Sequence, residues 1–514
     1  MVPSISDSAE AFSLARLTST AVLLLFSVWL ARSFQSWRRL RHIPGPPLAS
    51  VSMAWMAQKV ISGRFHEHMC LASEQYGPLV RIGPNTLLCA DPDTLRRMSS
   101  VRSLYTKGTF YESGRIIPGH DNIVSLRDEV MHKALRSKMA GAYSANVNLE
   151  AGVDRQLQNL VALIDAKYLS DNGNGHGTLR PFDLSTKSQF FALDVVSDVS
   201  FSGPFGFLTQ DKDLYDYVKI NDSAVPVMNL LQAIPGLTDF VYRWPMRLAL
   251  PGDGDEAGFG RLMGLAKGCV EERLRPGSKP RQDMLQAFID GGMTYDELIQ
   301  HMFVQIVAGS ITTAAAIRHT FAALLSTPTT YTTLQKEIDT NIASGRISSP
   351  TITDAEAQAL PYLQAVICEG MRMWPPTTGL GCKQVPPGGD VICGYHIPAG
   401  TQVGHNFGGT MRLKSIWGED ADLFRPERWI VDPDRGKEEE EDRLRAMQSV
   451  LELEFGSGKY GCFGKRIALM ELNKIFVEML RRYDFAAIDP LNPIKTTSGI
   501  FWTGSDQWLR VTKR

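Results

Sequence analysis

The sequence predicts one large, mainly α-helical domain with small β regions, placed behind an apolar segment at the N-terminus. Long stretches carry apolar residues at helical spacing, whereas strand-like pieces are short, as at 79–82 and 391–395. After about residue 50, no loop is long enough to argue a second domain in the 514 residues. We therefore expect one body over 51–514, joined to the N-terminal segment by a proline-rich hinge over 42–50.

Composition excludes several classes of protein. The 54 Lys and Arg residues balance 55 Asp and Glu residues, so no basic excess favours binding to nucleic acid. The seven cysteines include no CxxC and no close Cys/His pair of zinc spacing, which disfavours a disulfide framework and a zinc ribbon. Reduced thiols suit a body that faces the cytosol. The acidic run 438–442 is interpreted as a solvated loop.

The N-terminal segment 1–41 is predicted to be a membrane anchor. Its uncharged stretch 17–31 is shorter than the roughly 20 residues that cross a bilayer, but arginine and aromatic flanks extend the predicted single transmembrane helix to about 15–37. A cleavable signal peptide is the alternative. A basic cluster follows instead of a small-residue cleavage site, which favours an anchor with a cytoplasmic body (Arg32, Arg38, Arg39 and Arg41).

A long helix with a polar interruption is predicted from Thr294 to Leu325. Thr294 and Glu297 fit a capping box, and Pro328 is expected to stop the helix. The small residues of 308–313 would let a flat, bulky group approach the backbone. The hydroxyls of Thr312 and Thr313 could bond a carbonyl one turn earlier, a water or a ligand. Close packing of two helices is the alternative interpretation.

A second predicted helix begins at Pro361 and places Glu369 and Arg372 on one face. Alone, this pair is most simply a surface ion pair of small energetic value. Arg428, further along the chain, could complete a buried network of one carboxylate and two guanidinium groups.

The glycine-rich segment 455–466 precedes a third predicted helix and allows several interpretations. Residues 456–461 match GxGxxG, a pattern that can seat a pyrophosphate, but no apolar strand precedes them and no βαβ crossover follows. Alternatively, backbone N–H groups of the loop could stabilise the thiolate of Cys462, which is one of the few axial ligands of haem iron. An inert buried cysteine is the third interpretation.

Four separated features together resemble the cytochrome P450 family of haem-thiolate monooxygenases: 308–313, Glu369-x-x-Arg372, 426–429 and the loop from Phe455 to Gly464. Their order and spacing match across nearly the whole chain, and the sequence is similar to fungal microsomal members of the pisatin-demethylase-like group.

The resemblance implies the cytochrome P450 fold, as a single large haem domain behind an N-terminal membrane anchor. It also implies roles for individual residues. Cys462 would be the axial ligand of the iron of haem b, Thr312 and Thr313 would be catalytic, and Glu369, Arg372 and Arg428 would form a structural network. The implied cofactor-binding residues are His132, Arg136, Lys383, Phe455, Gly458, Tyr460 and Gly464.

Three positions depart from the family pattern. Tyr460 stands where Arg or His is usual, so a charged contact to a haem propionate is lost there. Lys383 replaces an arginine and forfeits bidentate geometry. Ile311 replaces the usual acidic residue before Thr312, which puts in doubt the delivery of protons during oxygen activation.

The resemblance implies a monooxygenase of the endoplasmic reticulum membrane that oxidises a lipophilic small molecule in fungal secondary metabolism. Its electrons would come from NADPH through a separate cytochrome P450 reductase, with cytochrome b5 as an optional second donor. The alternatives are a redox-neutral haem-thiolate isomerase or dehydratase, a non-catalytic haem protein, and a nicotinamide or flavin dehydrogenase that uses the GxGxxG loop. The predicted substrate contacts are Ala308, Gly309, Thr378, Leu380 and Phe501.

Overall fold

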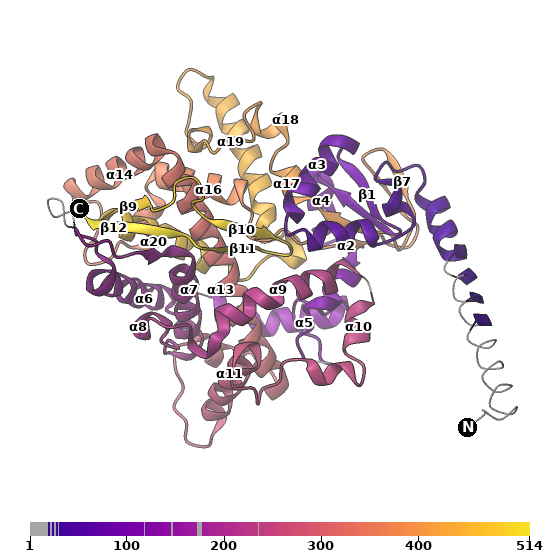
Figure 1. Cartoon of the computed structure of the whole chain (residues 1–514), viewed down its shortest axis with the longest axis horizontal. Coiled ribbons are helices and arrows are strands. Elements are labelled where there is room, and N and C mark those ends of the chain that lie inside the picture. Colours follow the sequence, from indigo (N-terminus) through magenta and orange to yellow (C-terminus); the bar gives the residue numbers. More distant parts are fainter. Residues whose placement is uncertain are drawn as a thin grey trace, which may run out of the picture.

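The computed structural model describes residues 19–20, 23–24, 27–28, 30–117, 119–144, 147–171, 177–234 and 236–514. Helices form most of the body, and the strands are short and gather in small sheets (Figure 1). The α-helices are α2 (Ala54–Ile61), α3 (Phe65–Tyr76), α4 (Pro92–Ser99), α5 (Glu129–Met139), α6 (Leu149–Leu163), α7 (Leu184–Phe201), α8 (Phe207–Gln210), α9 (Tyr217–Ala233), α10 (Leu237–Val241), α11 (Gly258–Leu274), α12 (Met284–Asp290), α13 (Tyr295–Ser326), α14 (Pro328–Ala343), α15 (Asp354–Gln358), α16 (Pro361–Met373), α17 (Phe407–Thr410), α18 (Lys414–Trp417), α19 (Lys437–Leu451) and α20 (Lys465–Leu480).

The strands are β1 (Leu79–Gly83), β2 (Thr86–Cys89), β3 (Thr106–Lys107), β4 (Phe182–Asp183), β5 (Lys383–Gln384), β6 (Asp390–Ile392), β7 (Tyr395–Ile397), β8 (Gln402–His405), β9 (Tyr483–Ala487), β10 (Lys495–Ser498), β11 (Trp502–Ser505) and β12 (Trp508–Lys513). The largest sheet has the order β1-β2-β8-β5-β3, in which β2 and β8 are parallel. The strand expected at 79–82 is confirmed as β1. The piece 391–395 is instead a hairpin of β6 and β7, because Cys393 and Gly394 turn the chain with φ values of 48° and 81°.

Helix α13 runs through the middle of the body and packs against α7, α11, α16 and α20. Its capping box is confirmed: Thr294 Oγ1 accepts a hydrogen bond from Glu297 N at 3.4 Å, and Glu297 Oε2 accepts one from Thr294 N at 2.8 Å. The helix ends at Ser326, and Pro328 begins α14. Because α13 is buried among other helices, its backbone is a rigid base for the residues in its middle.

The acidic run 438–442 is not a loop, so that prediction was wrong. These residues lie in the first turns of α19, where carboxylates favour the positive end of the helix. Glu440 is buried and accepts a hydrogen bond from Arg443 Nε at 2.8 Å. The acidic run therefore marks the start of a helix, although its composition was interpreted as that of a loop.

The predicted transmembrane helix (about 15–37) lies largely outside the described residues. Residues 30–40 are helical, Leu40 is fully buried, and Arg81 donates hydrogen bonds to the carbonyl oxygens of Ser36 and Ser50 at 2.9 Å. Within the described part of the chain, α13 is the one helix that is long and apolar enough to cross a membrane, and 67% of its apolar window is buried in the body. By its burial, α13 is a core helix.

Candidate active site

A cavity of about 340 Å³ lies between the middle of α13 and the glycine-rich loop that precedes α20. Ala308, Gly309, Thr312 and Thr313 line it from α13, and the loop contributes Phe455 and residues 460–464. Two segments about 150 residues apart in sequence therefore form opposite walls. The small side chains predicted to admit a bulky group do face this cavity, although Gly309 also lies tightly against Val196 of α7.

The loop before α20 is folded so that Cys462 points into the cavity. Gly456 and Gly458 have φ values of 68° and 56°, and a Cβ atom on Gly458 would lie 2.1 Å from the carbonyl oxygen of Ser99. Only glycine fits that position. The N–H of Cys462 donates to the carbonyl oxygen of Phe455 at 2.6 Å, which closes the loop. Glycine here shapes the turn and lets it pack closely.

The Cys462 thiol is open to the cavity while it is enclosed by the body of the protein. Burial raises the pKa of this thiol, and the backbone N–H groups of Gly464 and Lys465 oppose that rise, with help from the charge of Arg136. These N–H groups belong to the start of α20, where unpaired backbone donors stabilise negative charge. The N–H groups and Arg136 would therefore support a thiolate here once a positively charged partner such as a metal ion offsets the cost of burial.

The structure does not support a dinucleotide-binding loop at 456–461. The residues before it form the end of α19 and a 3-10 helix, Glu452–Phe455, instead of a strand. Helix α20 then leads to β9, which pairs with β12 in antiparallel fashion. The βαβ unit that positions a pyrophosphate is therefore missing from this part of the fold.

One end of the cavity is cationic. His132 and Arg136 of α5 line it, as predicted, and the guanidinium of Arg136 lies 4.0 Å from the ring centre of Phe463. Lys107 of β3 also lines this end, which the sequence did not reveal because β3 is only two residues long. Burial and the neighbouring Lys107 lower the pKa of His132 to about 4, so this imidazole is neutral at physiological pH.

Lys383 was predicted to bind the cofactor, but it does not line the cavity and lies behind its wall. Its ammonium donates to the hydroxyl of Tyr111 at 2.8 Å and lies 3.8 Å from the ring centre of Tyr460. Both tyrosines line the cavity. The hydroxyl of Tyr460 turns away and bonds Glu129. Position 460 therefore contributes an aromatic ring to the cavity, and the cation stands behind that ring.

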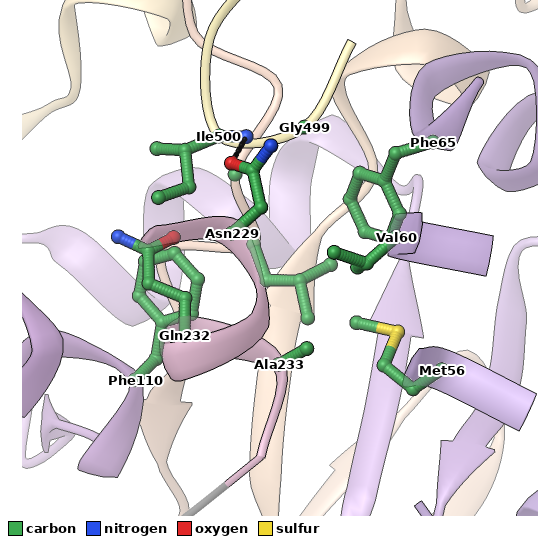
Figure 2. A pocket seen from close by; sticks show the side chains of 11 residues that line it. Met56, Val60, Phe65, Phe110, Asn229, Gln232, Ala233, Gly499 and Ile500 are labelled. Atoms are coloured by element: carbon green, nitrogen blue, oxygen red, sulfur yellow. Dashed lines mark hydrogen bonds between the residues drawn. The ribbon is translucent and has the colours of Figure 1, made fainter. Parts of the chain in front are cut away.

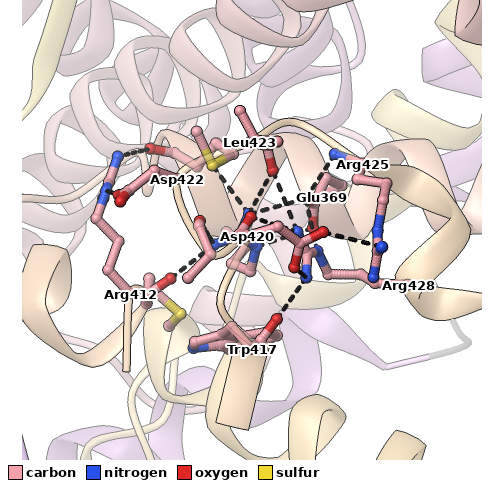
Figure 3. A network of polar contacts seen from close by, with 12 residues as sticks. Glu369, Arg412, Trp417, Asp420, Asp422, Leu423, Arg425 and Arg428 are labelled. Carbon is pink, nitrogen blue, oxygen red and sulfur yellow. Dashed lines mark hydrogen bonds and ion pairs between the residues drawn. The ribbon is translucent and has the colours of Figure 1, made fainter. Parts of the chain in front are cut away.

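Glu369, Arg372 and Arg428 form one buried network (Figure 3). Arg372 donates twice to the Glu369 carboxylate, at 2.8 Å each, and Arg428 Nε donates to it at 2.9 Å. Glu369 and Arg372 are fully buried, so the interpretation as a surface ion pair is wrong. The two guanidinium groups also bind backbone carbonyl oxygens of the irregular segment 411–423 (Met411, Trp417, Asp420, Ala421 and Leu423). The network therefore holds the segment 411–423 in place, which has little regular structure of its own.

The polar side chains of α13 are arranged on one side of the cavity. Thr312 Oγ1 donates to the carbonyl oxygen of Ala308 at 2.8 Å, and Thr313 lies beside it at the cavity wall. Ile311, the residue that departs from the family pattern, is buried with 4% exposure and does not line the cavity. A carboxylate at 311 would therefore replace a packed core side chain.

The remaining predicted substrate contacts lie beyond the main cavity. Leu380 lines a second, small cavity together with Phe110, Asn229 and Ile500 (Figure 2). The Asn229 side chain accepts a hydrogen bond from Ile500 N at 2.7 Å and so joins α9 to the turn between β10 and β11. Thr378 uses its hydroxyl to bind the carbonyl oxygen of Gly499 at 2.7 Å. Phe501 forms a backbone bridge with Thr377, which does line the main cavity.

Two buried carboxyl groups in the main cavity were missed by the sequence analysis. Glu454 and Glu471 line it, and burial raises the pKa of each well above the usual value. Within the described chain, both oxygens of Glu454 and the Oε2 atom of Glu471 are buried without a hydrogen-bond partner. No sequence signal distinguished them, because Glu454 reads as part of an alternating segment and Glu471 as one polar residue of a helix.

This site fits a flat cofactor that carries carboxylates and accepts a sulfur ligand. Lys107, His132 and Arg136 gather at one end without a buried carboxylate between them, which is the place for acidic groups of a ligand. Cys462 stands at the start of α20, and small residues of α13 face it across the cavity. These features are the donor set of a haem-thiolate protein.

Comparison with known proteins agrees with this class. The family model of cytochrome P450 matches residues 44–505. Cytochrome P450 monooxygenase ABA1 of Pyricularia oryzae is 40% identical over 503 residues, which cover 96% of this chain and 97% of that protein. Cytochrome P450 monooxygenase aba1 of Botryotinia fuckeliana is 37% identical, with 92% of each chain covered. The chain belongs to the cytochrome P450 family, whose members are haem-dependent monooxygenases that take electrons from a separate reductase.

Proposed function

We propose that Cys462 is the axial ligand of haem iron in a monooxygenase that oxidises a lipophilic small molecule. The observation that supports this role is the loop geometry, which presents one thiol to an enclosed cavity at the start of α20. A carbon monoxide difference spectrum of the reduced protein tests it, because a thiolate-ligated haem absorbs near 450 nm.

The other residues of the site hold and shape the cofactor. We assign Arg136 and His132 to the acidic edge of the haem, and Phe455, Gly458 and Gly464 to the loop that keeps Cys462 in place. Tyr460 contributes its ring and no charge. Glu369, Arg372 and Arg428 act at a distance, because they fix the segment 411–423 that leads toward the cysteine loop.

Bound haem supplies the redox chemistry by which one oxygen atom of O₂ enters the substrate. The protein supplies position and protons. The Thr312 hydroxyl is held at the cavity wall by the carbonyl oxygen of Ala308, so its oxygen is free to accept a hydrogen bond from a water. With Ile311 buried, proton delivery at this wall depends on Thr312, Thr313 and water.

Replacing Thr312 with alanine is expected to lower the rate of product formation about tenfold while NADPH consumption continues. The reason is that the hydroxyl which orders water at the cavity wall is lost, so reducing equivalents leave as hydrogen peroxide. Peroxide and product are measured per NADPH consumed. Thr312→Ser keeps the hydroxyl and should retain coupling; equal coupling in the alanine variant would contradict the role of Thr312.

The substrate is proposed to be a secondary metabolite of low polarity. Ile123, Val124 and Ala308 give the cavity apolar walls, and polar side chains are few on that side. Similar fungal proteins include cytochrome P450 monooxygenase abl1 of Leptosphaeria maculans, which is 36% identical with 80% of its length covered. Incubating the enzyme and a reductase with fungal extracts, and searching for mass increases of one oxygen atom, would identify the substrate.

We propose that the protein is anchored in the endoplasmic reticulum membrane by its N-terminus and faces the cytoplasm, where NADPH-cytochrome P450 reductase and cytochrome b5 can reach it. Exposed apolar side chains on the described part of the first helix support this (Leu23, Leu24, Val28, Leu30 and Phe34). These apolar side chains are not covered by the body of the protein, and an exposed apolar surface of this kind favours contact with lipid.

Deleting residues 1–29 should move the protein from the alkali-resistant membrane fraction to the supernatant while its haem spectrum remains. Residues 30–40 are retained because Leu40 is in the core and Arg81 binds Ser36. The fraction is measured by immunoblot after carbonate extraction. A truncated chain that stays in the pellet and keeps its haem would contradict the anchor.

A further inference from the structure

Two cysteines away from the main cavity lie in contact with each other. Cys89 ends β2 and is fully buried, and Cys393 is half-buried in the turn between β6 and β7. Both belong to the β-rich part of the body, where Figure 1 labels β1 and β7. Their thiols are hydrogen-bonded to each other, and Cys393 packs against the apolar cluster that contains Cys89. Neither residue lines the main cavity, so the haem site does not account for this contact.

The backbone holds the two thiols in place. Asn406 N donates to the carbonyl oxygen of Cys89 at 2.8 Å, and β2 is paired on both sides, with β1 and with β8. Cys393 has a φ value of 48°, in the left-handed region that favours glycine and asparagine. Residues with such a conformation cluster at functional sites. Two thiols held in hydrogen-bond contact need only a small side-chain movement to form a disulfide.

The two thiols differ in reactivity. Burial disfavours a charge on Cys89, and its hydrogen bond to Cys393 together with this burial raises the pKa of the Cys89 thiol well above the usual value. The same hydrogen bond, donated by Cys89, lowers the pKa of Cys393. Cys393 also precedes the exposed Gly394, so small solutes reach it. A thiolate is the form that attacks a peroxide, and a neighbouring thiol can then complete a disulfide.

We propose that Cys393 and Cys89 form a redox-active dithiol that hydrogen peroxide converts into an intramolecular disulfide. The Cys393 thiolate attacks one oxygen of the peroxide, the O–O bond breaks, and a sulfenic acid and hydroxide form. The hydroxide takes up the proton that Cys393 released on ionisation. The Cys89 sulfur then attacks the sulfur of Cys393, the S–O bond breaks, and the Cys89 proton leaves in a second water. The two thiols are thereby oxidised by two electrons, and the peroxide is reduced to water.

The proposed function supplies the oxidant. A monooxygenase releases hydrogen peroxide when reduced oxygen leaves before the substrate is oxidised. Because Ile311 is buried, proton delivery depends on Thr312, Thr313 and water, and slow proton delivery favours this loss. The inference rests on the proposed function only for this source of peroxide, since the dithiol itself needs no haem.

The disulfide would join two parts of the body that support the loop around Cys462. The hairpin of β6 and β7 is tied to α4 and to the segment after it, because Arg97 Nη1 donates to Asp390 Oδ2 at 2.6 Å and the Tyr105 hydroxyl binds the same carboxylate. The carbonyl oxygen of Tyr105 in turn accepts a hydrogen bond from Lys459 Nζ of that loop at 2.8 Å. A cross-link between β2 and the hairpin closes a long loop in the unfolded chain, so it stabilises the folded state.

The test uses purified full-length protein that has been supplied with haem, reduced, and then exposed to an excess of hydrogen peroxide. After alkylation of the remaining thiols, a non-reduced digest should contain two peptides joined through Cys89 and Cys393, and dithiothreitol should separate them. Cys393 should be consumed at least about tenfold faster than Cys269, a partly exposed cysteine of α11 whose pKa is raised by burial. If Cys89 and Cys393 remain free after Cys269 has reacted, the proposal is overturned.

Variants assign the order of the two steps. In Cys89→Ala, Cys393 should stop at the sulfenic acid and be captured by dimedone. In Cys393→Ser, Cys89 should stay a free thiol, because it is buried and not ionised. Rapid oxidation of Cys89 in the second variant would reverse the two roles and overturn the mechanism.

Unfolding in urea tests the consequence for stability. The midpoint of the oxidised wild type should lie about 0.5 M above that of the reduced form, and the shift should be absent in Cys393→Ser. Equal midpoints of the two wild-type forms would overturn the stabilising role. Added peroxide replaces turnover in these experiments. A wild-type protein that forms the disulfide but shows no 450 nm signal would therefore contradict the haem-thiolate site and support the dithiol.

Discussion

Replacing Cys462 with alanine is expected to abolish the 450 nm absorbance of the reduced, carbon monoxide-treated protein and to lower monooxygenase activity by more than about 10³-fold. The reason is chemical: a cysteine thiolate on iron pushes electron density that favours cleavage of the O–O bond, and Cys462 is the cysteine of this loop. Enzymatic rate accelerations begin near about 10⁶-fold, so loss of the reacting group removes a large part of them. The measurements are the difference spectrum and NADPH-dependent product formation.

The matched control is another cysteine away from the cavity. Cys269 lies in α11 and is partly exposed. Cys269→Ala should keep both the 450 nm signal and the activity, which would show that the effect at 462 is not a general effect of removing a thiol. A Cys462→Ala protein that still absorbs near 450 nm would mean that another residue is the ligand.

The shape of the loop around Cys462 could be predicted because the glycines in its sequence are required by the backbone conformation. Gly456 and Gly458 adopt positive φ values that few other residues tolerate, so their spacing before the cysteine reflects a backbone shape. The capping box of α13 is predictable for a similar reason, since Thr294 and Glu297 satisfy donors only a few atoms away. Local constraints of this kind are visible in a linear sequence.

Features that depend on distant partners were not predictable. Glu369 and Arg372 alone looked like a weak surface pair; the resemblance implied a network with Arg428, but only the fold shows the carbonyl oxygens of 411–423 that complete it. Lys107 carried no signal at all, because the strand that brings it to the cavity, β3, is only two residues long. The prediction for the acidic start of α19 was wrong, because its charges were interpreted as a sign of a solvated loop and not of a helix.

Replacing Glu369 with glutamine is expected to destabilise the folded protein by about 3–5 kcal/mol, because the buried Arg372 loses its counter-charge and Arg428 loses one of its two carboxylate partners. Glutamine has nearly the same size, so the change tests charge and not packing. Arg428 would keep its ion pair with Asp420 at 3.2 Å, whereas Arg372 would keep only its bonds to backbone carbonyl oxygens, which cannot neutralise its charge. The urea midpoint of unfolding and the loss of the haem spectrum measure the effect.

The control uses an ion pair of the same type on the surface. Lys437 and Glu441 lie 3.9 Å apart in α19, with side chains 91% and 58% exposed. Glu441→Gln should change stability by less than about 0.5 kcal/mol, because water already screens this pair. Similar small effects at 369 and 441 would show that the buried network does not hold the segment 411–423.

The same network predicts how stability depends on pH. Burial alone would raise the pKa of the Glu369 carboxyl, but hydrogen bonds and charge from Arg372 and the charge of Arg428 outweigh burial and lower it. A carboxyl whose pKa is lower in the folded state stabilises the fold above its unfolded value of about 4.3, and this contribution disappears as the pH falls through the folded value. Between pH 7 and acid, wild-type stability should therefore fall toward that of Glu369→Gln, which lacks this titration. A constant difference in unfolding midpoint between the two proteins down to about pH 3 would contradict an ionised Glu369.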